Sequence, residues 1–107
     1  MNLPKVITDL IKAQDDFDSV AYANCFTETG TMFDEGKAHT GRTEIRQCIE
    51  HANKKYHSVM KPLDYTGNET SGVLSANVSG TFEGSPAILK FHFDMADGQI
   101  RYLKVTG

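Results

Sequence analysis

The sequence from residue 86 to residue 105 reads PAILKFHFDMADGQIRYLKV, and its side chains change polarity at almost every position. Leu89, Phe91 and Phe93 alternate with polar or charged neighbours. Successive side chains of a β-strand point to opposite faces, so this period of two predicts a strand with one apolar and one polar face. The apolar face is expected to look into the core, and the other to meet water or a partner.

The same alternation starts near residue 58 and is broken by turn residues at Gly67-Asn68, Glu83-Gly84 and Asp97-Gly98. It predicts four consecutive strands, at residues 59–66, 72–82, 86–95 and 99–105. Because short turns join neighbouring strands, these four are expected to form an antiparallel meander.

The outer face of this meander is expected to carry Val73, Ile88, Leu103 and Val105. Together they would expose more apolar surface than a monomer usually leaves uncovered. A second copy of the chain would cover this surface, so the sequence predicts a homodimer through the sheet.

The first half of the chain has the period of helices instead. Apolar residues at helical spacing predict a helix over residues 3–14, and Asp18 is in place to cap a second, short helix. Residues 31–35 are rich in strand formers and lie between glycines, so they are expected to form a short edge strand. A third helix is expected to open near residue 40. Its apolar stripe comprises Ile45, Cys48, Ile49, Ala52 and Tyr56.

The order of these elements, two helices, a strand, a helix and four strands, defines the fold class α+β. At 107 residues the chain has the size of one domain with one core. Residues 1–107 are therefore expected to form a single domain, in which three helices pack against a curved mixed or antiparallel sheet. Hydrophobic residues make up 39% of the chain, which is enough to exclude a disordered segment.

The formal net charge is -3, and lysines and arginines form no run longer than Lys54-Lys55. Such a chain does not attract phosphate backbones or anionic lipids, so neither nucleic acid nor a membrane is an expected partner. The N-terminus lacks the basic and apolar segments of a signal peptide, which favours the cytoplasm. Cys25, Cys48 and the four histidines lack metal-ligand spacing, and no cofactor motif is present, so neither metal nor cofactor is expected.

The chain resembles the nuclear transport factor 2-like superfamily, which includes SnoaL-like polyketide cyclases and ketosteroid isomerase. The resemblance rests on Phe26-Thr27-Glu28 after the second helix, on Thr31-Met32-Phe33-Asp34, on residues 39–45 and on Asp97-Gly98-Gln99-Ile100. It covers nearly the whole chain. It implies a cystatin-like cone, in which the sheet wraps around the helices, has a pocket at its wide end and commonly packs against the sheet of a second subunit.

The resemblance also singles out Asp34, because the matching residue of ketosteroid isomerase is the general base. Strand alternation places Asp34 on the same face as Met32. A carboxylate among apolar side chains loses solvation, so its pKa rises toward the range that suits proton abstraction beside a carbonyl. The other interpretation is that Asp34, next to Glu35 and Gly36, faces water or caps the following turn.

The groups that stabilise the enolate oxygen in ketosteroid isomerase are missing. The resemblance places its tyrosine and protonated aspartate at Leu10 and Leu89, and its supporting tyrosine at Ile49, all of which are apolar here. Loss of one such donor costs about 3 kcal/mol of transition-state stabilisation, so steroid isomerisation by that route is not expected.

The implied pocket is expected to be lined by apolar residues together with one imidazole and one phenol. These residues are Leu10, Phe26, Met32, His39, Ile49, Tyr56, Leu89 and Phe91. Tyr22, Tyr56 and Tyr65 could each supply a hydroxyl, although a tyrosine on an apolar stripe is usually a core residue, and Tyr56 is the best placed. His39 near the expected pocket mouth is either a ligand contact or proton shuttle, or an exposed loop residue.

Two functions from different classes follow. In the first, the domain binds a small, largely apolar carbonyl compound and uses Asp34 as base in an isomerase- or cyclase-type proton transfer without a cofactor. In the second, it is a non-catalytic module for ligand binding or dimerisation on the same scaffold. An open cavity facing a buried Asp34 favours the first function, whereas a cavity filled by Leu10, Ile49 and Leu89 favours the second.

Overall fold

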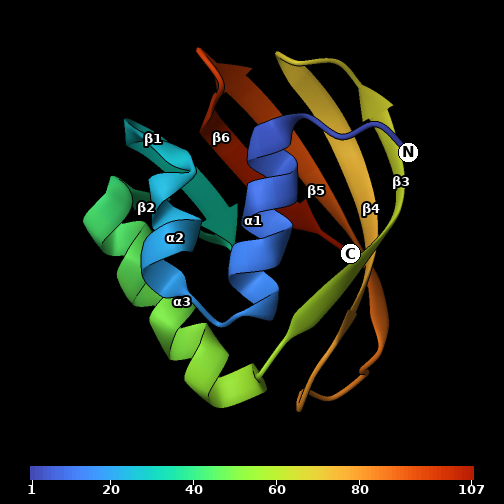
Figure 1. Cartoon of the computed structure of the whole chain (residues 1–107). Helices are drawn as coiled ribbons and strands as arrows, with labels where there is room; N and C mark the ends of the chain where they lie inside the picture. The colour runs from blue at the N-terminus through green and yellow to red at the C-terminus, as the bar shows by residue number, and fades with distance from the viewer.

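The structure is a computed structural model that describes residues 1–107. Three helices lie on one side of a curved six-stranded sheet (Figure 1). The helices are α1 (Lys5–Asp15), α2 (Ser19–Asn24) and α3 (Arg42–Tyr56). The strands are β1 (Phe26–Asp34), β2 (Lys37–Thr40), β3 (Val59–Gly67), β4 (Ser71–Ser79), β5 (Ala87–Ala96) and β6 (Gln99–Thr106). The α+β class is confirmed, with one strand more than the sequence predicted.

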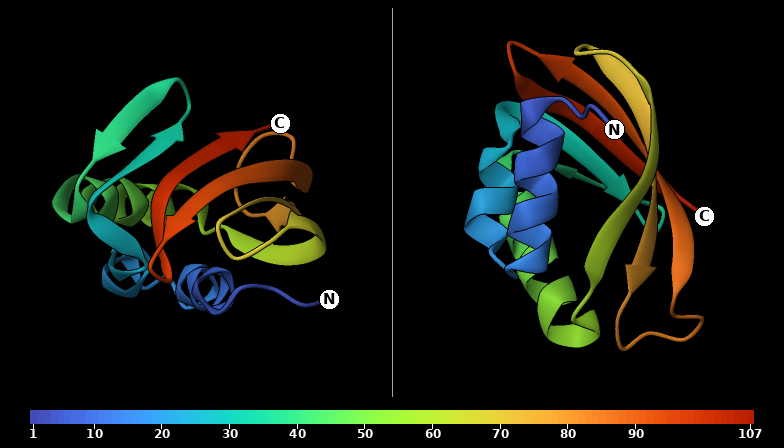
Figure 2. Two further views of the ribbon diagram at one scale, coloured as in Figure 1. Left: turned by 90° about the horizontal axis from the view of Figure 1, so that it is seen from above. Right: turned by 45° about the vertical axis from the view of Figure 1, so that its right-hand side comes forward.

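The strands are arranged in the order β2-β1-β6-β5-β4-β3. Consecutive strands β3 to β6 pair antiparallel, which confirms the meander, whereas β1 pairs parallel with β6 and makes the sheet mixed. The sheet is open and curls around the helices, as the two views in Figure 2 show. The curl is the cone expected from the resemblance.

The first strand differs from its prediction in length and in position. It begins at Phe26 rather than at residue 31, and it lies inside the sheet because β2 forms the edge. Its register against β6 shifts between Phe26 and Thr31. Gly30 lies in this irregular part, where an added Cβ would come within 3.0 Å of the Ile100 carbonyl oxygen, so a larger residue would push the strands apart.

A register shift in β6 reverses the faces predicted for its second half. Between the pairs Met95–Ile100 and Asp94–Tyr102, β5 advances by one residue and β6 by two, so Arg101 is an extra, bulged residue. Leu103 is therefore fully buried and Val105 points into the concave side, although both were expected on the outer face. Of the predicted outer set, only Val73 and Ile88 remain on that face.

The core forms between the helices and the concave face of the sheet. Helix α1 contributes a buried face that comprises Val6, Ile7, Leu10 and Ala13. The end of α1 is tied to the start of β3, because the backbone N–H of Met60 donates to Asp15 Oδ1 at 3.0 Å. Asp18 caps α2 as predicted, since its Oδ1 accepts from the N–H of Ala21 at 3.0 Å. No helix is long and apolar enough to span a membrane.

Candidate functional site

A cavity of about 580 Å³ lies between α3 and the concave face of the sheet. Its volume falls in the range of small-molecule pockets. Helix α3 forms one wall, mainly with Cys48, Ile49, Ala52, Asn53 and Tyr56. The sheet forms the other wall with Met60, Val78, Leu89, Phe91 and Val105. Gln14 of α1 and Tyr22 of α2 complete the lining between them.

Asp34 lines this cavity from the end of β1. Asp34 pairs with Lys37, and the two residues between them, Glu35 and Gly36, both have positive φ, at 51° and 77°. This is the geometry of a type I′ hairpin turn, which fixes the end of β1 against β2. The hairpin, rather than any side-chain partner, therefore sets the position of the Asp34 carboxylate.

Burial raises the pKa of Asp34 above its ordinary value, and the negative charge of Glu35 raises it further. The backbone N–H of Glu35 and the nearby His39 act in the opposite direction, lowering the pKa of Asp34 by stabilising its charge. The net direction is upward, as expected for a carboxylate that has lost part of its hydration. A group of this kind holds a proton more readily than a surface carboxylate does.

Tyr22 brings a phenol to the same part of the cavity. Its side chain is 3% exposed, and the hydroxyl has a single polar partner, the weak acceptor Met32 Sδ, at 4.0 Å. Burial raises the pKa of Tyr22, and the negative charge of Asp34 adds to the rise, so the phenol stays protonated. Tyr22 can thus donate a hydrogen bond to a ligand oxygen in the neighbourhood of the Asp34 carboxylate.

Tyr56 is the last residue of α3, and the loop between β4 and β5 packs against it. The ring of Phe82 packs edge-on against the ring of Tyr56, with 6.1 Å between centroids. The loop is anchored because the Thr81 N–H and Oγ1 both donate to the Tyr56 carbonyl oxygen, at 2.6 and 3.0 Å. The third tyrosine considered, Tyr65, lies elsewhere, and its hydroxyl donates to the Asn68 carbonyl oxygen at 2.7 Å.

The structure brings together five of the residues predicted to form the site. Asp34, Ile49, Tyr56, Leu89 and Phe91 all line the cavity. Ile49 and Leu89 lie in its walls without filling it, so the collapsed arrangement described above is not found.

Four other predicted pocket residues lie outside the cavity. Leu10 and Phe26 are fully buried and Met32 is 1% exposed, because α1 and α2 pack directly on the sheet at these positions and leave no space. His39 lies on the edge strand β2 opposite Met32, half-exposed, and its contact with the site is electrostatic, through the pKa of Asp34.

Gln14 and Asn53 are cavity residues that the sequence did not single out. Asn53 is the one buried polar residue of the chain, and it lies on α3 between cavity residues Ile49 and Tyr56. Asn53 follows Ile49 by four residues, so it lies on the apolar stripe of the helix. A polar residue at a stripe position is the feature by which the sequence could have identified it. A polar side chain on such a stripe needs partners inside the protein.

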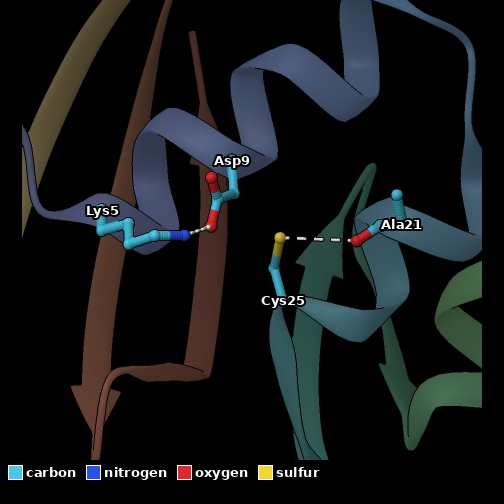
Figure 3. A network of polar contacts seen from close by, with 4 residues as sticks. All are labelled: Lys5, Asp9, Ala21 and Cys25. Atoms are coloured by element: carbon cyan, nitrogen blue, oxygen red, sulfur yellow. Dashed lines mark hydrogen bonds and ion pairs between the residues drawn. The ribbon is translucent and has the colours of Figure 1, made fainter.

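The two cysteines are both free, but they have different surroundings. Cys48 lines the cavity, and burial together with the charge of Asp34 raises its pKa. Cys25 follows α2 on another side of the molecule, and its Sγ donates to the Ala21 carbonyl oxygen at 3.4 Å (Figure 3). Burial raises the pKa of Cys25 to about 11, so it is not an activated thiol.

The ion pair shown beside Cys25 belongs to the helix surface rather than to a site. Lys5 Nζ and Asp9 Oδ2 lie 2.8 Å apart at positions i and i+4 of α1, with both side chains largely exposed (Figure 3). An exposed pair of this kind contributes little to stability. No group of three or more His, Cys, Asp or Glu side chains lies close enough together to hold a metal ion.

A curled sheet around helices, with a cavity facing one helix, defines the class of cystatin-like α+β cones. No protein-family model matches the chain, and no curated protein matches it either. Among solved structures, a "putative polyketide cyclase" from Sinorhizobium meliloti is 31% identical, with a TM-score of 0.92 over 97% of this chain and 95% of that one. The chain belongs to the nuclear transport factor 2-like superfamily, in which SnoaL-like polyketide cyclases are found.

More distant structures share the fold alone. A hypothetical protein with a ketosteroid isomerase-like fold from Catenulispora acidiphila, in complex with trimethylamine, is 16% identical with a TM-score of 0.88, over 99% of this chain and 87% of that one. SalBIII, an epoxide hydrolase/cyclase-like enzyme with a role in pyran ring formation in salinomycin, is 19% identical with a TM-score of 0.74, over 94% and 86%. The scaffold is therefore shared by proteins with different ligands and reactions.

Proposed function

We propose that the chain binds a small, largely apolar carbonyl compound in this cavity and catalyses an isomerase- or cyclase-type proton transfer with Asp34 as the general base. The single observation that carries the proposal is a half-buried carboxylate of raised pKa that lines an open, mainly apolar cavity. The likeness to the putative polyketide cyclase from Sinorhizobium meliloti supports a carbonyl ligand, because polyketides cyclise through carbons that lie beside carbonyl groups.

The proposed step moves one proton and needs no cofactor. Asp34 removes a proton from the carbon next to the ligand carbonyl, the C–H electron pair becomes a carbon–carbon double bond, and the carbonyl π electrons move to oxygen. Tyr22 donates a hydrogen bond to that oxygen while it carries the developing charge. In a ligand with a double bond next to that carbon, return of the proton from Asp34 to the far end of the double bond completes an isomerisation. In a ligand with a second carbonyl, attack of the enolate carbon on it re-forms the first carbonyl, and the new alkoxide takes the proton back from Asp34 to complete a cyclisation.

The second candidate function is a non-catalytic ligand-binding module. It is favoured by the loss of the isomerase donors, because the resemblance places their positions at the apolar residues Leu10, Ile49 and Leu89. Stabilisation of the enolate oxygen would then depend on Tyr22. The two candidates differ in a direct observable. A ketone in deuterated buffer exchanges hydrogen for deuterium beside its carbonyl when a base removes the proton, and it does not when it is merely bound.

The pKa of Asp34 itself is the first measurement to make. We expect its carboxyl resonance to titrate above the ordinary value of 3.8, because burial and Glu35 both disfavour the charged form. Heteronuclear NMR of the side-chain carboxyl carbon, followed across acid pH, reads this directly. An Asp34 that titrates near 4 has normal hydration and gives no reason to call it a base.

We also propose that two copies of the chain associate through the outer face of the sheet. The most exposed large apolar residue on that face is Ile88, at 62%, and Val73 and Phe33 lie half-buried on the same side. With Leu103 and Val105 directed inward, this apolar surface is smaller than the sequence suggested. The cytoplasmic location, and the absence of nucleic acid and membranes among the partners, stay predictions from charge and sequence.

Sedimentation velocity at micromolar concentration tests the homodimer. The wild-type chain is expected to sediment as a dimer, and Ile88→Glu as a monomer, because it places two carboxylates in the apolar centre of the contact. Lys54→Glu, on the exposed side of α3 and so on the other side of the sheet, serves as a charge-altering control that leaves the dimer intact. A monomeric wild-type protein contradicts the proposed use of this face.

A further inference from the structure

Two amide side chains meet at the end of the cavity where α1 and α3 finish. Gln14 Nε2 donates to Asn53 Oδ1 at 3.0 Å and to the Ser58 carbonyl oxygen at 2.8 Å. A backbone carbonyl only accepts, so the Gln14 atom that faces Ser58 has to be the amide nitrogen, and both of its hydrogens are used. The Asn53 atom that faces Gln14 is then its oxygen, so the network shows which atom of each amide is oxygen and which is nitrogen.

This arrangement leaves one donor and one acceptor of the pair without a protein partner. Asn53 is 9% exposed, and its Nδ2 is buried with no hydrogen-bond acceptor. Gln14 Oε1 accepts no hydrogen bond from the protein, because both hydrogen bonds of that amide go through Nε2. Both side chains line the cavity. Buried donors are nearly always paired, so an unpaired one in a cavity wall marks a place where a ligand supplies the partner.

The amide pair lies apart from the Asp34 end of the cavity. Asp34 ends β1, whereas Gln14 is hydrogen-bonded to Ser58 just before β3, and strands β6, β5 and β4 lie between β1 and β3 in the sheet. Apolar side chains, Ile49 and Ala52 on the helix and Leu89 on the sheet, also line the cavity.

We infer that Gln14 and Asn53 form a second polar subsite that takes a hydroxyl group of the ligand. A hydroxyl donates its hydrogen to Gln14 Oε1 and accepts from Asn53 Nδ2, so it satisfies both unpaired atoms at once. For its N–H to meet the ligand hydroxyl, the Asn53 amide has to rotate about its terminal torsion, which is soft. The inference rests on the proposed function, since the ligand carbonyl occupies the Asp34 end. The ligand class is then a hydroxylated carbonyl compound, with its two oxygens at opposite ends of the molecule.

Two matched probes test this subsite, namely benzylacetone and para-hydroxybenzylacetone, which differ by one hydroxyl at the end remote from the ketone. In calorimetric titrations of the full chain, we expect the hydroxylated probe to bind about tenfold more tightly, the effect of one well-made hydrogen bond. Asn53→Leu, which keeps the size of the side chain and removes the amide, is expected to abolish this preference. Its affinity for benzylacetone should stay within about twofold, because no polar contact with that probe is lost.

The side-chain amide signals of Asn53 give a readout that a purely structural role would not move. In wild-type protein they should shift with the hydroxylated probe and stay in place with benzylacetone, a result that also decides the matter if Asn53→Leu fails to fold. Asn77→Leu, the same substitution on β4 opposite Ile88, should keep the preference. So should Asp34→Asn, because it alters only the other end of the cavity.

The outcomes separate this inference from the proposed function. If benzylacetone binds but the added hydroxyl brings no gain, or if Asn53→Leu keeps the gain, the subsite is wrong and the carbonyl site stands. If neither ketone binds, the cavity does not take apolar carbonyl compounds, and both proposals fail together. If Asp34→Asn loses proton exchange while the hydroxyl preference remains, both proposals are supported independently.

Discussion

Replacing Asp34 with asparagine is expected to slow proton exchange beside the carbonyl of a bound ketone by about 10²- to 10⁴-fold, the usual contribution of a general base. Asparagine keeps the shape of the side chain at the end of β1 and loses only the ability to accept a proton. The exchange of benzylacetone in deuterated buffer, followed by proton NMR with and without protein, measures the effect. Calorimetry on the same variant should show that the ketone still binds.

Glu35→Gln is the matched control for this prediction, because Glu35 neighbours Asp34 in the hairpin turn and also lines the cavity. The negative charge of Glu35 raises the pKa of Asp34, so its removal lowers that pKa. The variant should keep the exchange activity, and the rise of its rate with pH should shift to lower pH. An exchange rate that is the same in wild type and Asp34→Asn removes the catalytic role and leaves the binding module.

Asp34→Asn, which should reduce activity, is expected to increase stability, and the pKa of Asp34 sets the sign of this effect. Its folded-state pKa is raised, so its stabilising contribution is complete below the ordinary value of 3.8 and is lost as pH rises through the raised value. Asparagine stays neutral at every pH. Asp34→Asn should therefore melt at a higher temperature than wild type at neutral pH, and the difference should shrink as pH falls toward 3.8. A residue that costs stability where it is charged fits a functional role better than a structural one.

Much of the fold could be predicted from the period of its side chains. In β5 the alternation around Phe91 gave the correct inward face, and the turn residues gave the correct hairpins, because both depend on neighbours in sequence. The early strands were harder, since β2 has only four residues and Phe26 continues the helical spacing of α2 while pairing with Ile100. Pairing between distant segments decides such cases, and no local pattern reports it.

The candidate site was predicted in part for the same reason. One cavity is lined by Asp34, Ile49, Tyr56, Leu89 and Phe91. The side-chain period of each helix or strand was enough to predict that these residues face inward. Leu10 and Phe26 also face inward, but they lie in the core and not in the cavity, because α1 and α2 pack closely against the sheet there. How closely two elements pack cannot be predicted from a local pattern in the sequence. The Gln14–Asn53 contact joins residues 39 positions apart, and only the folded chain brings them together.

Leu103→Ala is expected to lower the free energy of unfolding by about 2–5 kcal/mol, the usual cost of removing a fully buried leucine side chain. Leu103 has no exposed surface, and it pairs with Phe93 on one side and Met32 on the other, so the lost methyl groups leave a cavity at the centre of the sheet. Urea denaturation followed by circular dichroism measures the change, with the slope of the transition expected to stay constant.

Leu63→Ala is the control, because it makes the same chemical change at an exposed leucine of the same sheet. Leu63 lies at the register shift of β3 and is 46% exposed, so its truncation should cost less than about 1 kcal/mol. The comparison tests the bulge at Arg101 directly, since uninterrupted alternation along β6 would turn Leu103 to the outer face. If the two variants lose equal stability, Leu103 does not fill the core, and the inward turn of Val105 into the cavity wall is wrong as well.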